Sequence, residues 1–395
     1  MAADEIGVGV TFPLGFRAAG VASGQRVGDG PDLALVVNDG PTPAVAAVFT
    51  SNRFPAAPVR WSRQVMASGA TPTVVVMNSG GANACTGQAG WDQSGATAAR
   101  VAEALGCQPS QVLVGSTGII GRLLNIDALL DGVDQAATQL SRSGGAQAAQ
   151  AIMTTDTYPK VVAHNHGQFL VGGMAKGAGM IAPGMATLLV VVTTDASIDN
   201  DTAQQALAAA ADATFNRIDT DGCMSTNDTL MLLASGASGV SPSPDELTGA
   251  VTAACHELAQ QCVGDAEGAS HEIAITVDGA TTEQGALAVA RSIARSNLFK
   301  CAVFGNDPNW GRVLAAAGTV PPDVAPFDPD QVDIAINGVM VCRGGAIGEP
   351  RDLVDMASRR RVDVQVNLGA GSACATIYTN DLTYDYVKEN AEYST

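Results

Sequence analysis

Short runs of β-branched residues alternate along the chain with longer alanine-rich stretches. Continuous apolar runs of four to eight residues are typical of strands buried on both faces. Apolar segments at 73–77 and 112–114 therefore predict buried strands, and further strands are predicted at 187–194, 228–234, 271–278, 331–341, 361–368 and 373–379. Alanine-rich segments with helical periodicity predict helices over 95–105, 126–140, 202–214, 245–262 and 283–295. Asn125 and Asp201 are the candidate N-caps of the second and third of these.

The strands and helices are interleaved too irregularly for a strict βαβ series. We therefore expect a mixed α/β (α+β type) fold of stacked sheets flanked by helices, not a doubly wound Rossmann sheet. Polar, proline-rich segments at 240–246 and 320–330 predict loops or lobe boundaries. A chain of 395 residues is long for one core, so we expect two lobes, the smaller at the C-terminus.

Net charge, apolar runs, cysteines and histidines limit the classes of function that this chain can have. The formal net charge of −18 argues against a nucleic-acid partner, because a phosphate backbone would be repelled. The apolar run 188–192 is far shorter than the ~20 residues of a membrane span, and the N-terminus is acidic, so we expect a soluble, cytoplasmic protein. The eight cysteines contain no C-x-x-C pair and the four histidines no ligand spacing, so we expect reduced thiols and no metal.

The most informative segment is a glycine-rich stretch, 174–186, that leads directly into Thr187 and an apolar run. If the chain is cut before Thr187, the new α-amino group lies on the same residue as the hydroxyl that it activates. An α-amino group titrates near ~7.7 to 8.0, so part of it is a free base at neutral pH. The segment therefore predicts an acyl-transfer enzyme with an N-terminal threonine nucleophile.

Two other interpretations of this stretch stay open. The glycines can simply join two strands, with Thr187 as a β-former at a strand start. Gly177, Gly179 and Ala182 also fit the loose dinucleotide-binding spacing G-x-G-x-x-[G/A], although Pro183 interrupts the helix that this fingerprint requires. Lys176 is either a solvated loop charge or a cation for a substrate carboxylate.

Acyl transfer also needs donors for a carbonyl oxygen that becomes negatively charged. Residues 112–122 (VLVGSTGIIGR) supply candidates, because a short strand runs into a glycine-rich turn where the Thr117 hydroxyl and the Gly118 amide can point outward. Taken alone, this is a common glycine turn.

Together with other segments, however, these motifs resemble one family nearly end to end. The segments are MAKGAGMIAPGMATLL (174–189), GSTGIIGR (115–122), AIMTTDTYPK (151–160), STNDT (225–229), NDPNWGR (306–312) and DLTYDYVKENAEYST (381–395). They closely resemble the bacterial ornithine acetyltransferases, also called bifunctional glutamate N-acetyltransferase and amino-acid acetyltransferase of arginine biosynthesis.

This resemblance implies self-cleavage in the context K-G-x-G-M-x-x-P-x-x-A-T, between Ala186 and Thr187, which divides the chain into segments 1–186 and 187–395. It implies Thr187 as the nucleophile, with Thr117 and Gly118 as the oxyanion hole. The implied substrate contacts are Thr154, Lys176, Thr187, Glu267, Asn390 and Thr395. Around Glu267 the sequence departs from the family pattern D-G-E-G-A-[TS]-K at Ala266 and His271, but the glutamate itself is present.

The implied reaction moves the acetyl group of N2-acetylornithine to glutamate through an acetyl-Thr187 ester, releasing ornithine and N-acetylglutamate. We expect no cofactor, and the resemblance leaves open whether acetyl-CoA is a second donor. It also implies a heterotetramer of two segments of each kind. Three alternatives stay open: a self-processing amidase or aminopeptidase, a relative acting on other acetylated amino acids, and a noncatalytic metabolite-binding protein.

Overall fold

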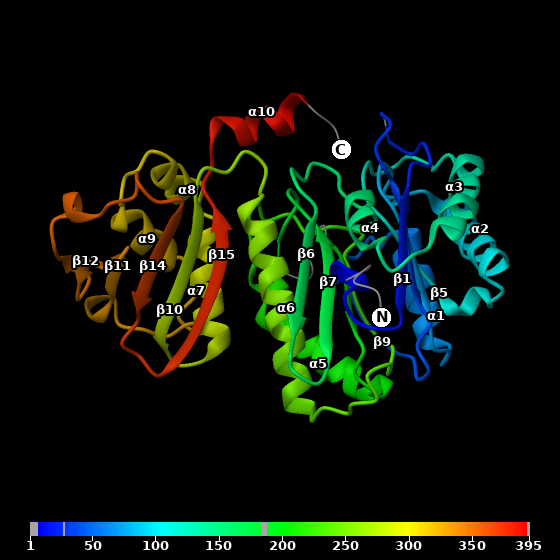
Figure 1. Cartoon of the computed structure of the whole chain (residues 1–395). Coiled ribbons are helices and arrows are strands. Elements are labelled where there is room, and N and C mark those ends of the chain that lie inside the picture. The colour runs from blue at the N-terminus through cyan, green and yellow to red at the C-terminus, as the bar shows by residue number, and fades with distance from the viewer. Residues whose placement is uncertain (1–6, 27, 183–187, 393–395) are drawn as a thin grey trace. The chain divides into compact units, whose positions relative to one another are not determined.

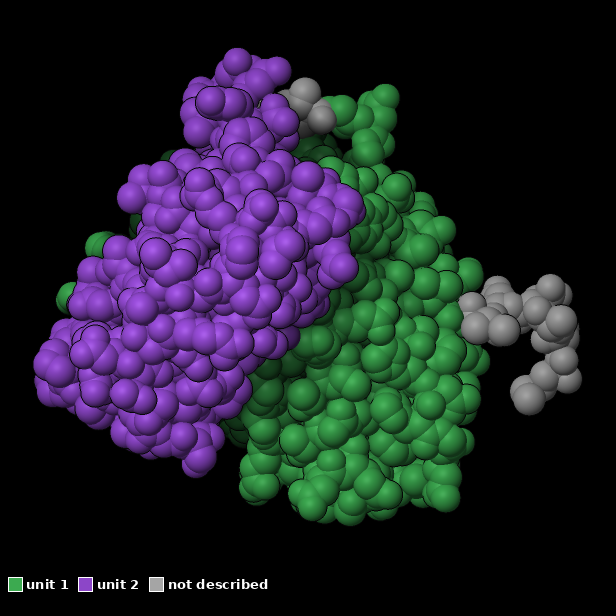
Figure 2. Space-filling model, turned by 90° about the vertical axis from the view of Figure 1, so that its left-hand side faces the viewer, with its two compact units in different colours: residues 1–216, 223–265, 395 green, residues 217–222, 266–394 purple. Residues whose placement is uncertain are grey.

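The computed structural model describes residues 7–26, 28–182 and 188–392. Within them the chain divides into two compact units, coloured separately in Figure 2. Unit 1 contains residues 7–216 and 223–265, and unit 2 contains 217–222 and 266–392. The main border therefore follows Asp265. Segments 240–246 and 320–330, predicted as loops or lobe boundaries, are a loop leading into a helix and a loop within unit 2.

Unit 1 contains two mixed sheets. The first has the order β1-β2-β4-β5 and consists of β1 (Phe16–Val21), β2 (Leu33–Asn38), β4 (Val74–Asn78) and β5 (Val112–Ser116). The second has the order β3-β9-β8-β7-β6 and consists of β3 (Ala44–Phe49), β6 (Lys160–Asn165), β7 (Leu170–Lys176), β8 (Leu189–Thr194) and β9 (Thr229–Ala234). Among the described strands of unit 1, only the pairs β4–β5 and β8–β9 are parallel.

The two sheets stack face to face, because alternate residues of a strand point to opposite faces. On β2, Ala34 and Val36 belong to a core that also contains Val191 of the second sheet. Leu35, between them, packs on the other face with Val101 of a helix. Strands buried on both faces need apolar residues at every position, which explains the continuous runs in the sequence.

Helices flank both sheets of unit 1 (Figure 1). They are α1 (Ala57–Ala67), α2 (Gly87–Leu105), α3 (Ile126–Gln139), α4 (Gly145–Ala151), α5 (Asn200–Ala213) and α6 (Pro244–Gly264). α2 and α3 pack on the first sheet, while α5 and α6 contact each other and the second sheet. The predicted stacked sheets flanked by helices are confirmed.

The predicted helix caps need correction. The N-cap of α5 is Asp199, whose side chain accepts a hydrogen bond from the amide of Thr202 at 2.7 Å. Asp199 has extended backbone angles, as a cap requires, whereas Asp201 already lies in the first turn. Asn125 stands at the N-cap position of α3, but its side chain makes no capping hydrogen bond.

Unit 2 is the smaller C-terminal part and contains one six-stranded sheet of order β13-β12-β11-β14-β10-β15. Its strands are β10 (Glu272–Ala280), β11 (Asp333–Ile336), β12 (Val339–Arg343), β13 (Ala346–Ile347), β14 (Arg361–Asn367) and β15 (Ala373–Asn380). Its helices are α7 (Glu283–Ala294), α8 (Asn297–Phe304), α9 (Trp310–Ala317) and α10 (Tyr384–Glu392). Residues of α7, α8 and α9 share one apolar core with the sheet.

The single strand predicted over 331–341 is wrong, because this segment is a hairpin of β11 and β12. Asn337 and Gly338 form its turn with φ of +48° and +85°. Asn-Gly is a strong hairpin signal, because both residues tolerate positive φ. Within the described residues, no helix is long and apolar enough to cross a membrane.

Candidate active site

Thr117 lies immediately after β5 and is buried, with 1% of its surface exposed. Its amide donates to the carbonyl of Asn78 at 2.9 Å, so its backbone nitrogen is already used within unit 1. Its hydroxyl oxygen accepts a hydrogen bond from Lys176 Nζ at 3.3 Å. A hydroxyl that accepts through its oxygen still has its own proton to donate. The side chain of Thr117 can therefore act as an oxyanion donor.

Gly118 follows with a φ of +125°. A Cβ at this position would lie 2.6 Å from the carbonyl carbon of Gly80 and 2.7 Å from the nitrogen of Gly81, so only glycine fits. In the part of the chain that the structure describes, the Gly118 amide has no hydrogen-bond acceptor. The pair predicted from the sequence thus supplies one hydroxyl and one amide donor.

Lys176 is the last residue of β7 and only 2% exposed, so its interpretation as a solvated loop charge is wrong. The lysine ends a strand that pairs on both sides, with β6 and with β8. A buried ammonium is costly unless it is paired or hydrogen-bonded. Besides its bond to Thr117, Lys176 acts through its positive charge, which lowers the pKa of Asp156.

Asp156 connects two of the predicted site segments. One carboxylate oxygen accepts from the amide of Thr154 at 3.0 Å. The other accepts from the amide of Gly177 and from Lys160 Nζ, each at 2.7 Å. Burial alone would raise the pKa of Asp156, but the charges of Lys176 and Lys160 outweigh it and hold the pKa below its usual value. Thr154 and the residue after Lys176 are therefore fixed by one charged carboxylate.

Lys160 completes a buried ionic cluster. Its side chain is fully buried and also donates to Asp265 at 2.6 Å. Asp265 in turn accepts from the amide of Thr157 at 2.9 Å and from the Thr157 hydroxyl. Burial opposes the charged ammonium, but Asp156 more than compensates and raises the pKa of Lys160. Sequence reasoning missed this cluster, because Asp265 lies 105 residues from Lys160 in the chain.

The residues that lead into β9 contact two segments of the candidate site, one before Thr117 and one before β8. Asn227 donates from its side-chain nitrogen to the carbonyl of Ser116 at 2.8 Å and to that of Ala82 at 2.6 Å. Asp228 accepts from the amide of Leu188 at 3.0 Å. The STNDT motif therefore links the turn that carries Thr117 and Gly118 to the start of β8. Ala186, Thr187 and Thr395, which the sequence assigns to the site, lie outside the described residues.

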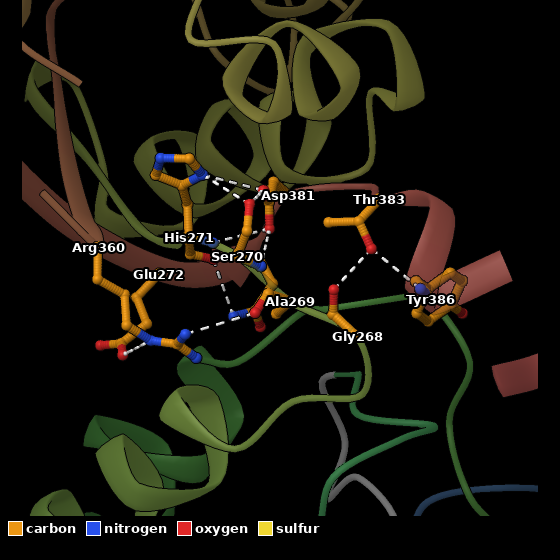
Figure 3. A network of polar contacts seen from close by, with 10 residues as sticks. Gly268, Ala269, Ser270, His271, Glu272, Arg360, Asp381, Thr383 and Tyr386 are labelled. Atoms are coloured by element: carbon orange, nitrogen blue, oxygen red, sulfur yellow. Dashed lines mark hydrogen bonds and ion pairs between the residues drawn. The ribbon is translucent and has the colours of Figure 1, made fainter. Parts of the chain in front are cut away.

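Glu267 and Asn390 meet within unit 2, where Asn390 Nδ2 donates to Glu267 Oε2 at 3.0 Å. Thr383 supports the same contact by donating to the carbonyl of Gly268 at 2.6 Å and accepting from the amide of Tyr386 at 2.9 Å (Figure 3). The start of α10 is thus tied to the segment that carries Glu267.

Figure 3 also shows Ser270, His271 and Asp381 together, the residue types of a hydrolase triad. However, Nδ1 of His271 lies 3.0 Å from Ser270 Oγ and 3.0 Å from Asp381 Oδ2, so the same ring nitrogen faces both. A triad needs the serine on Nε2 and the aspartate on Nδ1. Asp381 also accepts from the amides of Ser270 and His271, which makes this a loop-stabilising network.

Residues 177–182 form a loop in which no helix begins, so the dinucleotide fingerprint lacks the helix that it requires. Trp310 begins α9 and packs against the core of unit 2. Among the described residues, no group of three or more His, Cys, Asp or Glu is placed to hold a metal ion.

A family model for ArgJ matches residues 17–395. The chain belongs to the ArgJ family. It is 57% identical over 385 residues to the arginine biosynthesis bifunctional protein ArgJ of Streptomyces avermitilis, covering 98% of this chain and 99% of that one. The ArgJ protein of Bifidobacterium longum is 54% identical over 389 residues, covering 97% and 99%. The family resemblance expected from the sequence motifs is confirmed.

Solved structures of the family also match this ArgJ-family chain. One is ornithine acetyltransferase of Mycobacterium tuberculosis complexed with ornithine, which is 50% identical, with a TM-score of 0.44, and covers 46% of this chain and 96% of the solved one. Another is the ArgJ protein of Bacillus halodurans, 36% identical with a TM-score of 0.48, covering 51% and 97%.

Proposed function

We propose that this ArgJ-family enzyme of arginine biosynthesis transfers the acetyl group of N2-acetylornithine to glutamate. The observation that carries the proposal is the buried hydrogen bond from Lys176 to Thr117, beside the Gly118 amide. It orients a hydroxyl and leaves an amide available where an acyl-transfer site needs two donors. The similarity to ArgJ relatives over almost the whole chain supports the same reaction.

Self-cleavage between Ala186 and Thr187 makes the nucleophile. The cut frees the α-amino group of Thr187, which then takes the proton from its own hydroxyl. β7 precedes the cut, β8 follows it, and the two pair as antiparallel neighbours, so segments 1–186 and 187–395 stay joined through one sheet. We propose that two segments of each kind assemble into a heterotetramer.

The chemistry proceeds in two half-reactions. Thr187 Oγ attacks the acetyl carbonyl, and the Thr117 hydroxyl and Gly118 amide stabilise the oxyanion. The C–N bond then breaks, ornithine leaves with the proton held by the Thr187 amine, and an acetyl ester remains. The α-amine of glutamate attacks this ester, so N-acetylglutamate forms and the threonine hydroxyl is restored.

The amino-acid substrates carry a negative carboxylate and a positive amine, and the proposed binding residues can contact both groups. Lys176 is suited to an α-carboxylate. Thr154, held by Asp156, adds a polar contact from unit 1. Glu267 and Asn390 are suited to an amine, and the terminal carboxylate of Thr395 is anionic at neutral pH. The enzyme needs no cofactor in this scheme, and acetyl-CoA is a candidate second donor.

The test starts with intact-mass measurement of the purified protein. We expect two polypeptides that correspond to 1–186 and 187–395, and one uncut chain for T187A. Incubation of the cut enzyme with N2-acetylornithine and glutamate should yield ornithine and N-acetylglutamate, with parallel double-reciprocal lines. T187A should lose about 10⁴-fold or more of kcat.

Parallel assays separate the alternatives. Acetate released to water without transfer indicates an amidase, and substrate binding by an uncut, inactive chain indicates a metabolite-binding protein. Replacing N2-acetylornithine with acetyl-CoA decides whether the enzyme uses a second donor. Intersecting double-reciprocal lines, or full activity in T187A, would contradict the acetyl-threonine mechanism.

A further inference from the structure

Asp228 is a fully buried carboxyl whose Oδ1 accepts a hydrogen bond from the amide of Leu188 at 3.0 Å. That amide nitrogen belongs to the peptide bond between residues 187 and 188. The partners are 40 residues apart in the chain, so tertiary structure brings them together. Asp228 therefore acts on the backbone directly after the proposed nucleophile.

The backbone of Leu188 is fixed from both sides. Its carbonyl accepts from the amide of Thr229 at 2.9 Å, while its amide donates to Asp228. The parallel pairing of β8 and β9 begins one residue later, at Leu189 and Thr229. The backbone of Asp228 is held too, because its carbonyl accepts from the amide of Thr50 at 2.9 Å. The side chain of Asp228 thus extends the ladder by one contact towards residue 187.

The hydrogen bonding and the pKa of the Asp228 carboxyl are unusual for a side chain that only supports the fold. In the described part of the chain, its Oδ2 is buried without a hydrogen-bond partner. Burial raises the pKa of Asp228 well above its usual value, although hydrogen bonds from the Leu188 amide and the Ser225 side chain and the charge of Lys176 act in the opposite direction. A buried polar atom without a partner costs stability, so its presence needs another explanation.

We propose that Asp228 is a positioning residue, which fixes the Leu188 amide and thereby aligns the Thr187 hydroxyl for acyl transfer. The inference rests on the proposed function and adds a residue to it. Hydrogen-bond acceptance by Oδ1 is the property that matters. An asparagine retains this acceptor and is uncharged, whereas a leucine of similar size removes it.

The test compares D228N and D228L in the full-length chain. Cut chain is quantified by intact mass, and kcat and KM are measured per mole of cut protein. We expect D228L to lose about 100-fold in kcat, because small misplacement of a reacting group costs this much. KM for N2-acetylornithine should change less than about threefold, and D228N should stay within about tenfold of the wild-type kcat. If D228L stays uncut while D228N is cut, the alignment fails at self-cleavage and the proposal is equally supported.

Asp195 provides the matched control. It is also a buried aspartate, it follows β8 at the opposite end of the strand, and it accepts from the amides of Leu170 at 2.7 Å and Leu14 at 3.3 Å. D195L should lower the thermal midpoint but leave the kcat of the folded, cut enzyme within about threefold of wild type.

Several results would overturn the role of Asp228 alone. They are an unchanged kcat in D228L, an equal loss in D228N and D228L, an equal loss in D195L, and a loss confined to KM. A wild-type protein that is not cut or transfers no acetyl group would instead overturn the proposed function together with this inference.

Discussion

The side-chain amide of Asn227 donates a hydrogen bond to the carbonyl of Ser116 across 111 residues of sequence. Ser116 directly precedes the proposed oxyanion pair, and the same amide group holds the carbonyl of Ala82 in the adjoining segment. The Ser116 hydroxyl donates to the side-chain oxygen of Asn78 at 2.6 Å. The turn that carries Thr117 is therefore fixed by side chains from two other segments.

Replacing Asn227 with leucine should reduce catalysis through this turn. N227L leaves two buried carbonyls without their donor, and it frees the oxyanion turn to shift. We expect a loss of about 100-fold in kcat with a small change in KM, measured with N2-acetylornithine and glutamate.

Asn38 is a matched control for N227L, because it is also buried and donates to the carbonyl of Ala234 at 2.8 Å. N38L should lose stability, measured by thermal unfolding, but keep the kcat of the folded enzyme. Equal losses of kcat in N38L and N227L would show that Asn227 serves only the fold.

Gly118 and Gly121 form a second matched pair. Both have positive φ, of +125° and +80°, but a Cβ at Gly121 meets no atom within 4 Å. G118A should displace the oxyanion amide and reduce kcat about 10²- to 10³-fold, as loss of one such donor does. G121A should cost only about 1–2 kcal/mol of backbone strain. Steady-state kinetics of both variants make the comparison, and a G118A enzyme with the kcat of G121A would remove Gly118 from the site.

Those parts of the fold that depend on local pattern were predictable from the sequence. The buried runs became β4, β5, β8 and β9, because strands covered on both faces need apolar residues throughout. β1, β2, β3 and β6 were not predicted, and β1 and β3 show one reason. Their segments FRAAGV and AVAAVF contain alanine and glycine, which carry little β-signal, and only pairing with β2 and β9 defines them as strands.

The candidate site was predictable only where a motif lies within one segment. Thr117, Gly118 and Lys176 were named as candidates in this way, and the structure brings Lys176 and Thr117 into contact. Asp228 and Asp156 stood in quoted motifs, yet their roles depend on contacts with Leu188 and Gly177 that no local pattern encodes. The burial of Lys176 was missed for the same reason, because a strand end next to a glycine-rich stretch reads as a loop.

The cluster of Lys160, Asp156 and Asp265 predicts a strong effect on stability. K160M removes the cation that contacts both buried carboxylates, and breaking a buried ion pair in this way costs about 3–5 kcal/mol. The triple variant K160M/D156N/D265N removes all three charges and should be more stable than K160M alone. Urea unfolding of both proteins measures the difference. A triple variant that is less stable than K160M would contradict this account.

The C-terminus offers a test that separates binding from self-cleavage. Thr383 and Asn390 tie α10 to residues 267–268, and Thr395 is a proposed substrate contact. A bulky C-terminal extension should therefore raise KM for N2-acetylornithine while the chain is still cut at 186–187. The same extension at the N-terminus is the control. Unchanged KM values in the C-terminally extended enzyme would remove Thr395 from the binding site.

The lowered pKa of Asp156 predicts how the free energy of unfolding changes with pH. Its pKa is lowered in the folded protein, mainly because the charges of Lys176 and Lys160 outweigh the effect of burial. A carboxyl with a depressed pKa stabilises the fold above its unfolded pKa of about 3.9, and it loses this contribution as pH falls through the folded pKa. The difference in unfolding free energy between wild type and D156N should therefore be constant from neutral pH to about pH 5 and shrink at lower pH. Urea unfolding of both proteins between about pH 7 and pH 3 measures this difference. The pH-dependent contributions of the other carboxyl groups cancel, because both proteins contain them. A difference that grows as pH falls would mean that Asp156 is protonated more readily in the folded chain, and the ionic cluster would then not stabilise its charged form.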